Sequence, residues 1–134
     1  MIDVNFKGIL YGVAAALPVF REQGFGHFVN IVSTSGLQIV PLQSVYAATK
    51  NAVRTFSEGL RQEAGDRLRV TVVSPGITRT EFADPMLPEM RAQILKRAAI
   101  AMPPEAIARA VAFAVEQPAN VDVGDIVVRP TAKG

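Results

Sequence analysis

The 134-residue chain contains no cysteine and no tryptophan, and it has a single histidine. Without cysteine it can form neither a disulfide nor a thiolate metal site, and one histidine argues against a histidine-based metal centre, so no metal site is expected. No apolar run reaches the roughly 18 residues that a transmembrane helix needs, and the N-terminus lacks the layout of a signal peptide. These absences predict a cytoplasmic protein that uses neither a metal nor a membrane.

Charge is also sparse, because charged residues make up only 19% of the chain and the formal net charge is +2. The lysines and arginines are scattered and form no basic stripe with interleaved aromatic residues, so nucleic-acid binding is not expected. The hydrophobic content of 49% is typical of a globular protein. The length predicts a single domain that spans residues 1–134.

The spacing of apolar residues predicts helices and strands in alternation. Helices are expected over residues 3–23, 45–64 and 103–116, strands over 27–33, 68–74 and 125–129, and a mobile helix within the polar stretch 80–101. Pro18 is expected to make the end of the first helix irregular, whereas Gly65 suits the C-terminal cap of the second. Apolar strands that alternate with helices predict an α/β fold, with a parallel sheet covered on both faces.

Tyr46 and Lys50 are the most informative pair of residues. One turn apart in the predicted helix 45–64, they share a face, and a nearby positive charge would lower the phenol pKa from its ordinary value of about 10. Such a tyrosine can act as general acid or base on a carbonyl or alcohol. Alone, this spacing usually marks a surface pair. With Ser33 upstream and Pro75-Gly76 after the next strand, it predicts a catalytic site.

Several segments, in this order, resemble the C-terminal half of the short-chain dehydrogenase/reductase family. They are Asp3-Val-Asn5, Asn30 to Gly36 with its Ser33, Tyr46-Ala-Ala-Thr-Lys50 with the helix to Glu63, Val73 to Thr80, and Ile126 to Ala132. The resemblance implies the C-terminal half of a doubly wound Rossmann-type fold, which is a partial parallel sheet flanked by helices. The family's glycine-rich turn, which holds the cofactor pyrophosphate, has no counterpart in this sequence.

The resemblance also implies an NAD(P)-dependent oxidoreductase that transfers hydride between a nicotinamide and a small hydroxy or keto compound. It implies that Tyr46 is the general acid/base, that Ser33 orients the substrate oxygen, and that Lys50 lowers the Tyr46 pKa and binds the nicotinamide ribose. Asn5 would extend a proton relay from Lys50 to solvent. The nicotinamide end would be held by Pro75, Gly76, Ile77 and Thr80, with a substrate lid over residues 82–97. The cofactor could be NAD or NADP, since the residues that select between them have no counterpart here.

Three alternatives stay open. Asn5 and Thr80 could instead cap helices. The chain could be a truncated, non-catalytic remnant that acts as a self-associating assembly module, because lacking the first half would expose a sheet edge. The sequence could also be part of a longer protein. A homo-oligomer is expected in any case, formed through helices 3–23 and 45–64 or through that edge.

Overall fold

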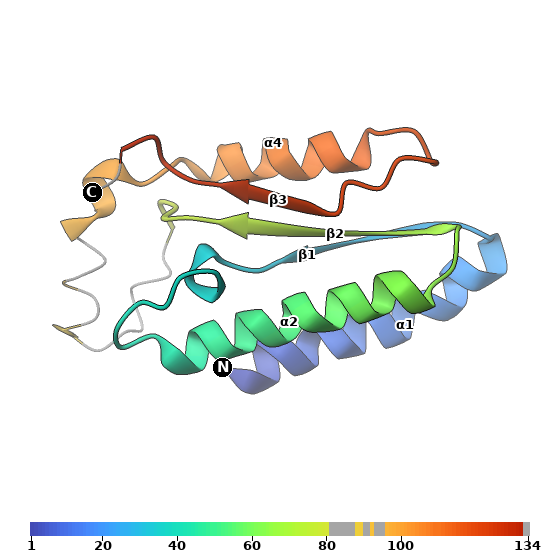
Figure 1. The fold of residues 1–134 in the computed structure, drawn as a ribbon, viewed down its shortest axis with the longest axis horizontal. Helices are drawn as coiled ribbons and strands as arrows, with labels where there is room; N and C mark the ends of the chain where they lie inside the picture. The colour runs from blue at the N-terminus through green and yellow to red at the C-terminus, as the bar shows by residue number, and fades with distance from the viewer. Residues whose placement is uncertain (81–87, 90–91, 93–95, 133–134) are drawn as a thin grey trace.

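A computed structural model describes residues 1–80, 88–89, 92 and 96–132 (Figure 1). The main elements are α1 (Gly8–Gln23), β1 (Gly26–Ile31), α2 (Ser44–Glu63), β2 (Leu68–Pro75), α4 (Pro104–Val115) and β3 (Asp125–Val128). Short helical turns are η1 (Asp3–Lys7), η2 (Thr34–Gly36) and η4 (Ala98–Ile100). Among the described residues the predicted order of helices and strands is confirmed; residues 3–7 of the first helix form η1, and the other bounds shift by at most two residues. Most of the stretch 80–101, and with it the predicted mobile helix, lies outside the described residues.

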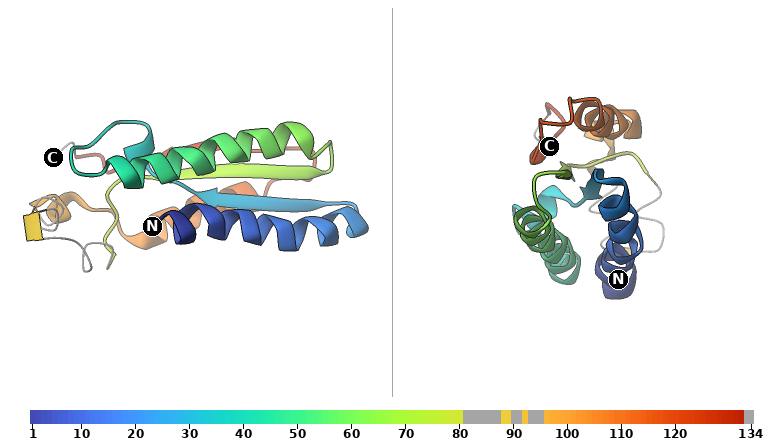
Figure 2. Two further views of the ribbon diagram at one scale, coloured as in Figure 1. Left: turned by 90° about the horizontal axis from the view of Figure 1, so that it is seen from below. Right: turned by 90° about the vertical axis from the view of Figure 1, so that its right-hand side faces the viewer.

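The strands form a three-stranded parallel sheet in the order β1-β2-β3. Gly26 lies opposite Leu68, and Val72 lies opposite Asp125. Helices α1 and α2 cover one face of the sheet and α4 covers the other (Figure 2). The predicted class, a partial Rossmann-type parallel sheet flanked by helices, is therefore confirmed.

The core lies between the sheet and the layer formed by α1 and α2. One buried cluster joins Val13 of α1 and Leu60 of α2 to Phe28 and Val70 of the sheet. Another joins Val53, which is fully buried, to Val32 and Val72. Since this layer packs α2 directly against β1 and β2, it fixes the start of α2 relative to the ends of both strands.

The first helix differs from the expected form at both ends. It begins with the π-helical turn η1, which runs directly into α1. Pro18 lies inside α1, which continues to Gln23 and ends at Gly24 with a φ of 82°. The expected irregularity at Pro18 was therefore wrong: proline removes a helical hydrogen bond, but Leu17 and Phe20 on either side of it pack against the core. Of the described helices, none is both long and apolar enough to cross a membrane.

Candidate active site

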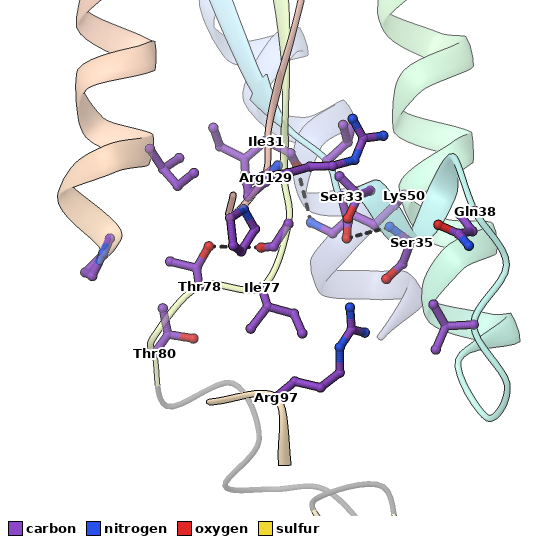
Figure 3. A pocket seen from close by; sticks show the side chains of 18 of the residues that line it. Ile31, Ser33, Ser35, Gln38, Lys50, Ile77, Thr78, Thr80, Arg97 and Arg129 are labelled. Atoms are coloured by element: carbon purple, nitrogen blue, oxygen red, sulfur yellow. Dashed lines mark hydrogen bonds between the residues drawn. The ribbon is translucent and has the colours of Figure 1, made fainter. Parts of the chain in front are cut away.

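Seven of the eight predicted site residues surround one cavity of about 930 Å³ (Figure 3). It lies at the carboxyl ends of β1 and β2, the edge at which open α/β sheets bind ligands. Ser33 follows β1, Tyr46 and Lys50 lie at the start of α2, and Pro75, Gly76, Ile77 and Thr80 end or follow β2. The eighth residue, Asn5, does not line the cavity.

Ser33 is buried, and its extended backbone places it at the N-cap of η2. Its Oγ accepts a hydrogen bond from the Ser35 N–H at 3.1 Å. The hydroxyl proton can still be donated, because that contact uses only a lone pair. Its side chain also hydrogen-bonds Tyr46. The loop therefore holds the Ser33 hydroxyl beside the Tyr46 phenol at the cavity.

Lys50 contacts both Tyr46 and the end of β1. Its Nζ donates to the Ile31 carbonyl oxygen at 3.2 Å and lies 5.7 Å from the centre of the Tyr46 ring. Burial lowers the pKa of Lys50, because desolvation disfavours the ammonium form. Its charge therefore lies over the ring of Tyr46, while its hydrogen bond goes to the main chain.

The pKa of Tyr46 is shifted in the direction opposite to the predicted one. Burial raises the pKa of Tyr46, and the hydrogen bond with Ser33 opposes this only in part. The predicted lowering of the Tyr46 pKa by Lys50 is therefore wrong for this structure, because desolvation of the phenol outweighs other influences. At neutral pH the phenol keeps its proton, which is the form that can donate to a carbonyl oxygen.

Asn5 lies inside η1 and contacts the turn of α2 that carries Tyr46 and Lys50. Its Nδ2 donates to Thr49 Oγ1 at 3.4 Å, and the Thr49 hydroxyl donates to the Tyr46 carbonyl oxygen at 2.7 Å. The N-cap of η1 is Ile2, so Asn5 does not cap that helix. Short π-helical segments are frequent at functional sites, and this one places Asn5 against α2.

The turn after β2 approaches the end of β3 closely. The Gly76 N–H donates to the Val128 carbonyl oxygen at 2.7 Å. A Cβ at Gly76 would lie 3.2 Å from Pro130 and 3.3 Å from that same oxygen, so a side chain would force the two segments apart. Next in the chain, the Ile77 carbonyl accepts the Met102 N–H at 2.9 Å. These contacts fix the backbone beside the cavity.

The sequence did not single out two arginines that line the cavity, Arg97 and Arg129. Arg129 follows β3, so its place at the carboxyl edge of the sheet could have been inferred from the strand order. No comparable sequence pattern pointed to Arg97. It belongs to the expected lid segment 82–97, which has no strong periodicity and lies mostly outside the described residues. Ser35 and Gln43 also line the cavity and are joined by a 2.9 Å hydrogen bond.

Comparison of the sequence with known proteins identifies the family of this chain. A model of the short chain dehydrogenases matches residues 1–91, which is more than half of the chain. The chain belongs to the short-chain dehydrogenase family. An oxidoreductase of Staphylococcus saprophyticus, named as uncharacterized, is 42% identical over 137 residues; the match covers 99% of this chain and 56% of that protein. This short-chain dehydrogenase chain therefore spans about half the length of such relatives.

Solved structures agree with the family and with the fold. The closed form of a serine dehydrogenase complexed with NADP⁺ is 35% identical, with a TM-score of 0.87, over 96% of this chain and 53% of that one. Serine dehydrogenase from Escherichia coli is 31% identical, with a TM-score of 0.75, over 92% of this chain and 49% of that one. At the level of the family, the chain resembles dehydrogenases that use nicotinamide cofactors.

Proposed function

We propose that this chain is an NAD(P)-dependent oxidoreductase that transfers hydride between a nicotinamide and a small hydroxy or keto compound. The observation that carries the proposal is the convergence of Ser33, Tyr46 and Lys50 on one cavity beside the Gly76 turn. The serine dehydrogenase bound to NADP⁺ supports the choice of cofactor. Serine carries both a hydroxyl and an acid group, so hydroxy acids belong among the substrates to be tested.

The residues around the cavity fit the nicotinamide end of such a cofactor. The cavity is of a size that holds small molecules. Lys50 would bind the ribose hydroxyls, Ile77 would offer its N–H to the carboxamide because its carbonyl is bound to Met102, and Thr80 would add a hydroxyl. Pro75 and Gly76 would shape the backbone on which the ring lies. The chain has no glycine-rich turn for the pyrophosphate, so we expect weak cofactor binding by the chain alone.

Three side chains would handle the reacting oxygen. When bound, the nicotinamide supplies the hydride in reduction and takes it in oxidation. Tyr46 Oη would give its proton to the substrate oxygen in reduction and take it back in oxidation. Ser33 would hydrogen-bond the same oxygen and orient it, and Lys50 would hold the phenol in place. Asn5, through its backbone or an ordered water, would extend a proton relay from Lys50 to solvent.

The test is NADH and NADPH oxidation with a panel of aldehydes, ketones and keto acids. Tyr46→Phe should lower the rate by about 100-fold or more, because it removes the general acid and keeps the ring. Tyr11→Phe, which changes an exposed tyrosine outside the cavity, should leave the rate unchanged. An equal rate in wild type and Tyr46→Phe would contradict the proposed role.

A second function is an assembly module, which the exposed apolar side chains on η1, α1 and α2 favour. Val4 is 77% exposed, Tyr11 is 69% exposed and Val45 is 56% exposed. Within the described part of the chain, β1 pairs on one side only, so its other edge can bind a strand. We infer a homo-oligomer through helices 3–23 and 45–64 or through this edge.

We further propose that residues 1–134 form one domain and that the protein works in the cytoplasm.

Oligomerisation is tested by light scattering after size-exclusion chromatography at tens of micromolar. A double variant, Val4→Lys and Tyr11→Lys, should shift the mass toward the monomer if the helices form the interface. An unchanged mass would exclude Val4 and Tyr11 from the interface and leave α2 and the edge of β1 as the candidates. A wild-type monomer at these concentrations would rule out the assembly module.

A further inference from the structure

The cavity carries positive charge without any acidic side chain among the described residues that line it. Its charged lining residues are Lys50, Arg97 and Arg129. This imbalance does not follow from composition, because the chain has 14 basic and 12 acidic residues. Positive charge inside a concave site attracts anionic ligands. The cavity is therefore electrostatically suited to an anion.

Arg97 is the cation that faces the reacting groups from the opposite wall. Figure 3 shows its side chain extending from the segment before η4 into the cavity, toward the side that carries Ser33 and Lys50. Within the described part of the chain, the ion pairs involve Lys7, Arg54 and Arg61, and none involves Arg97. Its guanidinium therefore points into the cavity, and no carboxylate of the described residues neutralises it.

The three cations are not equivalent. Lys50 already contacts Tyr46 and the Ile31 carbonyl. Arg129 follows β3, and its backbone lies next to the Gly76 turn, beside which we place the nicotinamide. Arg97 extends from the opposite wall toward the side on which Ser33 would hold the substrate oxygen (Figure 3). A guanidinium presents paired N–H donors that match a carboxylate in a bidentate contact.

We propose that Arg97 binds the carboxylate of a hydroxy-acid or keto-acid substrate, an inference that rests on the proposed function. The acid group takes no part in the chemistry, and its contact with Arg97 orients the carbonyl or hydroxyl carbon toward Tyr46 and Ser33. Ile100, Ile107 and Val111 line the same cavity and provide apolar surface for a short carbon chain. Arg97 is thus a specificity-determining residue.

Binding can be measured without turnover. The probes are 2-oxobutanoate, 3-hydroxybutanoate and 4-oxopentanoate, each paired with its methyl ester, titrated into the cofactor-free chain by ligand-detected NMR. At least one acid should bind more tightly than its ester by about tenfold or more. Arg97→Gln should remove that preference and leave ester binding unchanged. The matched control is Arg79→Gln, since Arg79 is an exposed arginine of the same region that does not line the cavity.

The outcomes separate this inference from the proposed function. Equal binding of acids and esters by wild type, no binding of any acid, or unchanged acid preference in Arg97→Gln would each overturn the role of Arg97. Loss of the preference in Arg129→Gln but not in Arg97→Gln would do the same. Turnover of neutral ketones at equal rates by wild type and Arg97→Gln would then leave the oxidoreductase proposal intact. Acid binding that depends on Arg97, without hydride transfer to any substrate, would support the inference and contradict that proposal.

Discussion

The Lys50 ammonium lies 5.7 Å from the centre of the Tyr46 ring and donates to the Ile31 carbonyl oxygen at 3.2 Å. One lysine thus connects the start of α2 to the end of β1. The carbonyl contact restricts the long side chain, so the charge is held beside the phenol without requiring a bound ligand. We therefore expect Lys50 to position the phenol in addition to making its proposed contact with the cofactor.

Lys50→Met should lower the NADH-dependent rate by about 100-fold, because it removes the charge beside Tyr46 while keeping the apolar stem. It should also weaken NADH binding, measured by nicotinamide fluorescence. Lys7→Met is the matched control, since Lys7 forms only an exposed pair with Asp3. If both variants keep wild-type rates, Lys50 has no part in turnover.

The raised pKa of Tyr46 makes stability depend on pH in the alkaline range. The unfolded chain loses this proton near the ordinary value of about 10, whereas the folded chain holds it to higher pH. The folded state therefore binds more protons in that window, and stability falls as pH rises through it. Urea unfolding at pH 8 to 11 should show a steeper decline for wild type than for Tyr46→Phe. Parallel curves would contradict the burial of the phenol.

The sequence predicted those features of the site that depend on residues close together in the chain. Tyr46 and Lys50 lie one turn apart, and Ser33 and Gly76 each follow a strand, so local patterns and the parallel order of strands were sufficient to bring them together. The Tyr46 pKa could not be predicted in the same way. Its direction depends on the water removed by the surrounding loop, and sequence spacing does not describe that quantity.

Contacts between distant segments were also missed. Asn30 of β1 is buried and donates to Ser57 of α2 at 2.8 Å, 27 residues away. A polar residue in an apolar strand gives no indication of its partner, because the rotation of α2 against the sheet selects it. Arg97 shows the same limit, since its place in the cavity depends on a segment with no strong local pattern.

The Asn30–Ser57 contact predicts a stability effect. Ser57 is fully buried and also donates to the Val53 carbonyl at 2.7 Å. Ser57→Ala should cost about 1–3 kcal/mol of unfolding free energy, because it leaves the buried Asn30 amide without its acceptor. Thr55→Ala, an exposed position on the same helix, should change stability far less. Equal losses in urea denaturation would contradict a specific role for the buried contact.

His27, the chain's single histidine, predicts a pH effect at the opposite end of the sheet. Its Nε2 lies 2.8 Å from Thr71 Oγ1, and its Nδ1 is buried with no hydrogen-bond partner in the described part of the chain. Burial lowers the pKa of His27, the charge of Arg69 lowers it further, and Asp122 opposes both. The neutral imidazole is therefore the form that the fold accepts.

Because the folded pKa of His27 is below the unfolded value of about 6.5, the unfolded chain binds more protons between the two values. The unfolding free energy should be unaffected by His27 above pH 6.5. It should fall as the pH decreases from 6.5 toward the lowered pKa of the folded state. His27→Gln removes the titrating group, so its unfolding free energy should vary less than that of wild type between pH 7.5 and pH 4.5. Both proteins share every other titrating residue, so the difference between their curves isolates His27. A constant difference across this range would show that the imidazole titrates equally in both states and would contradict its burial.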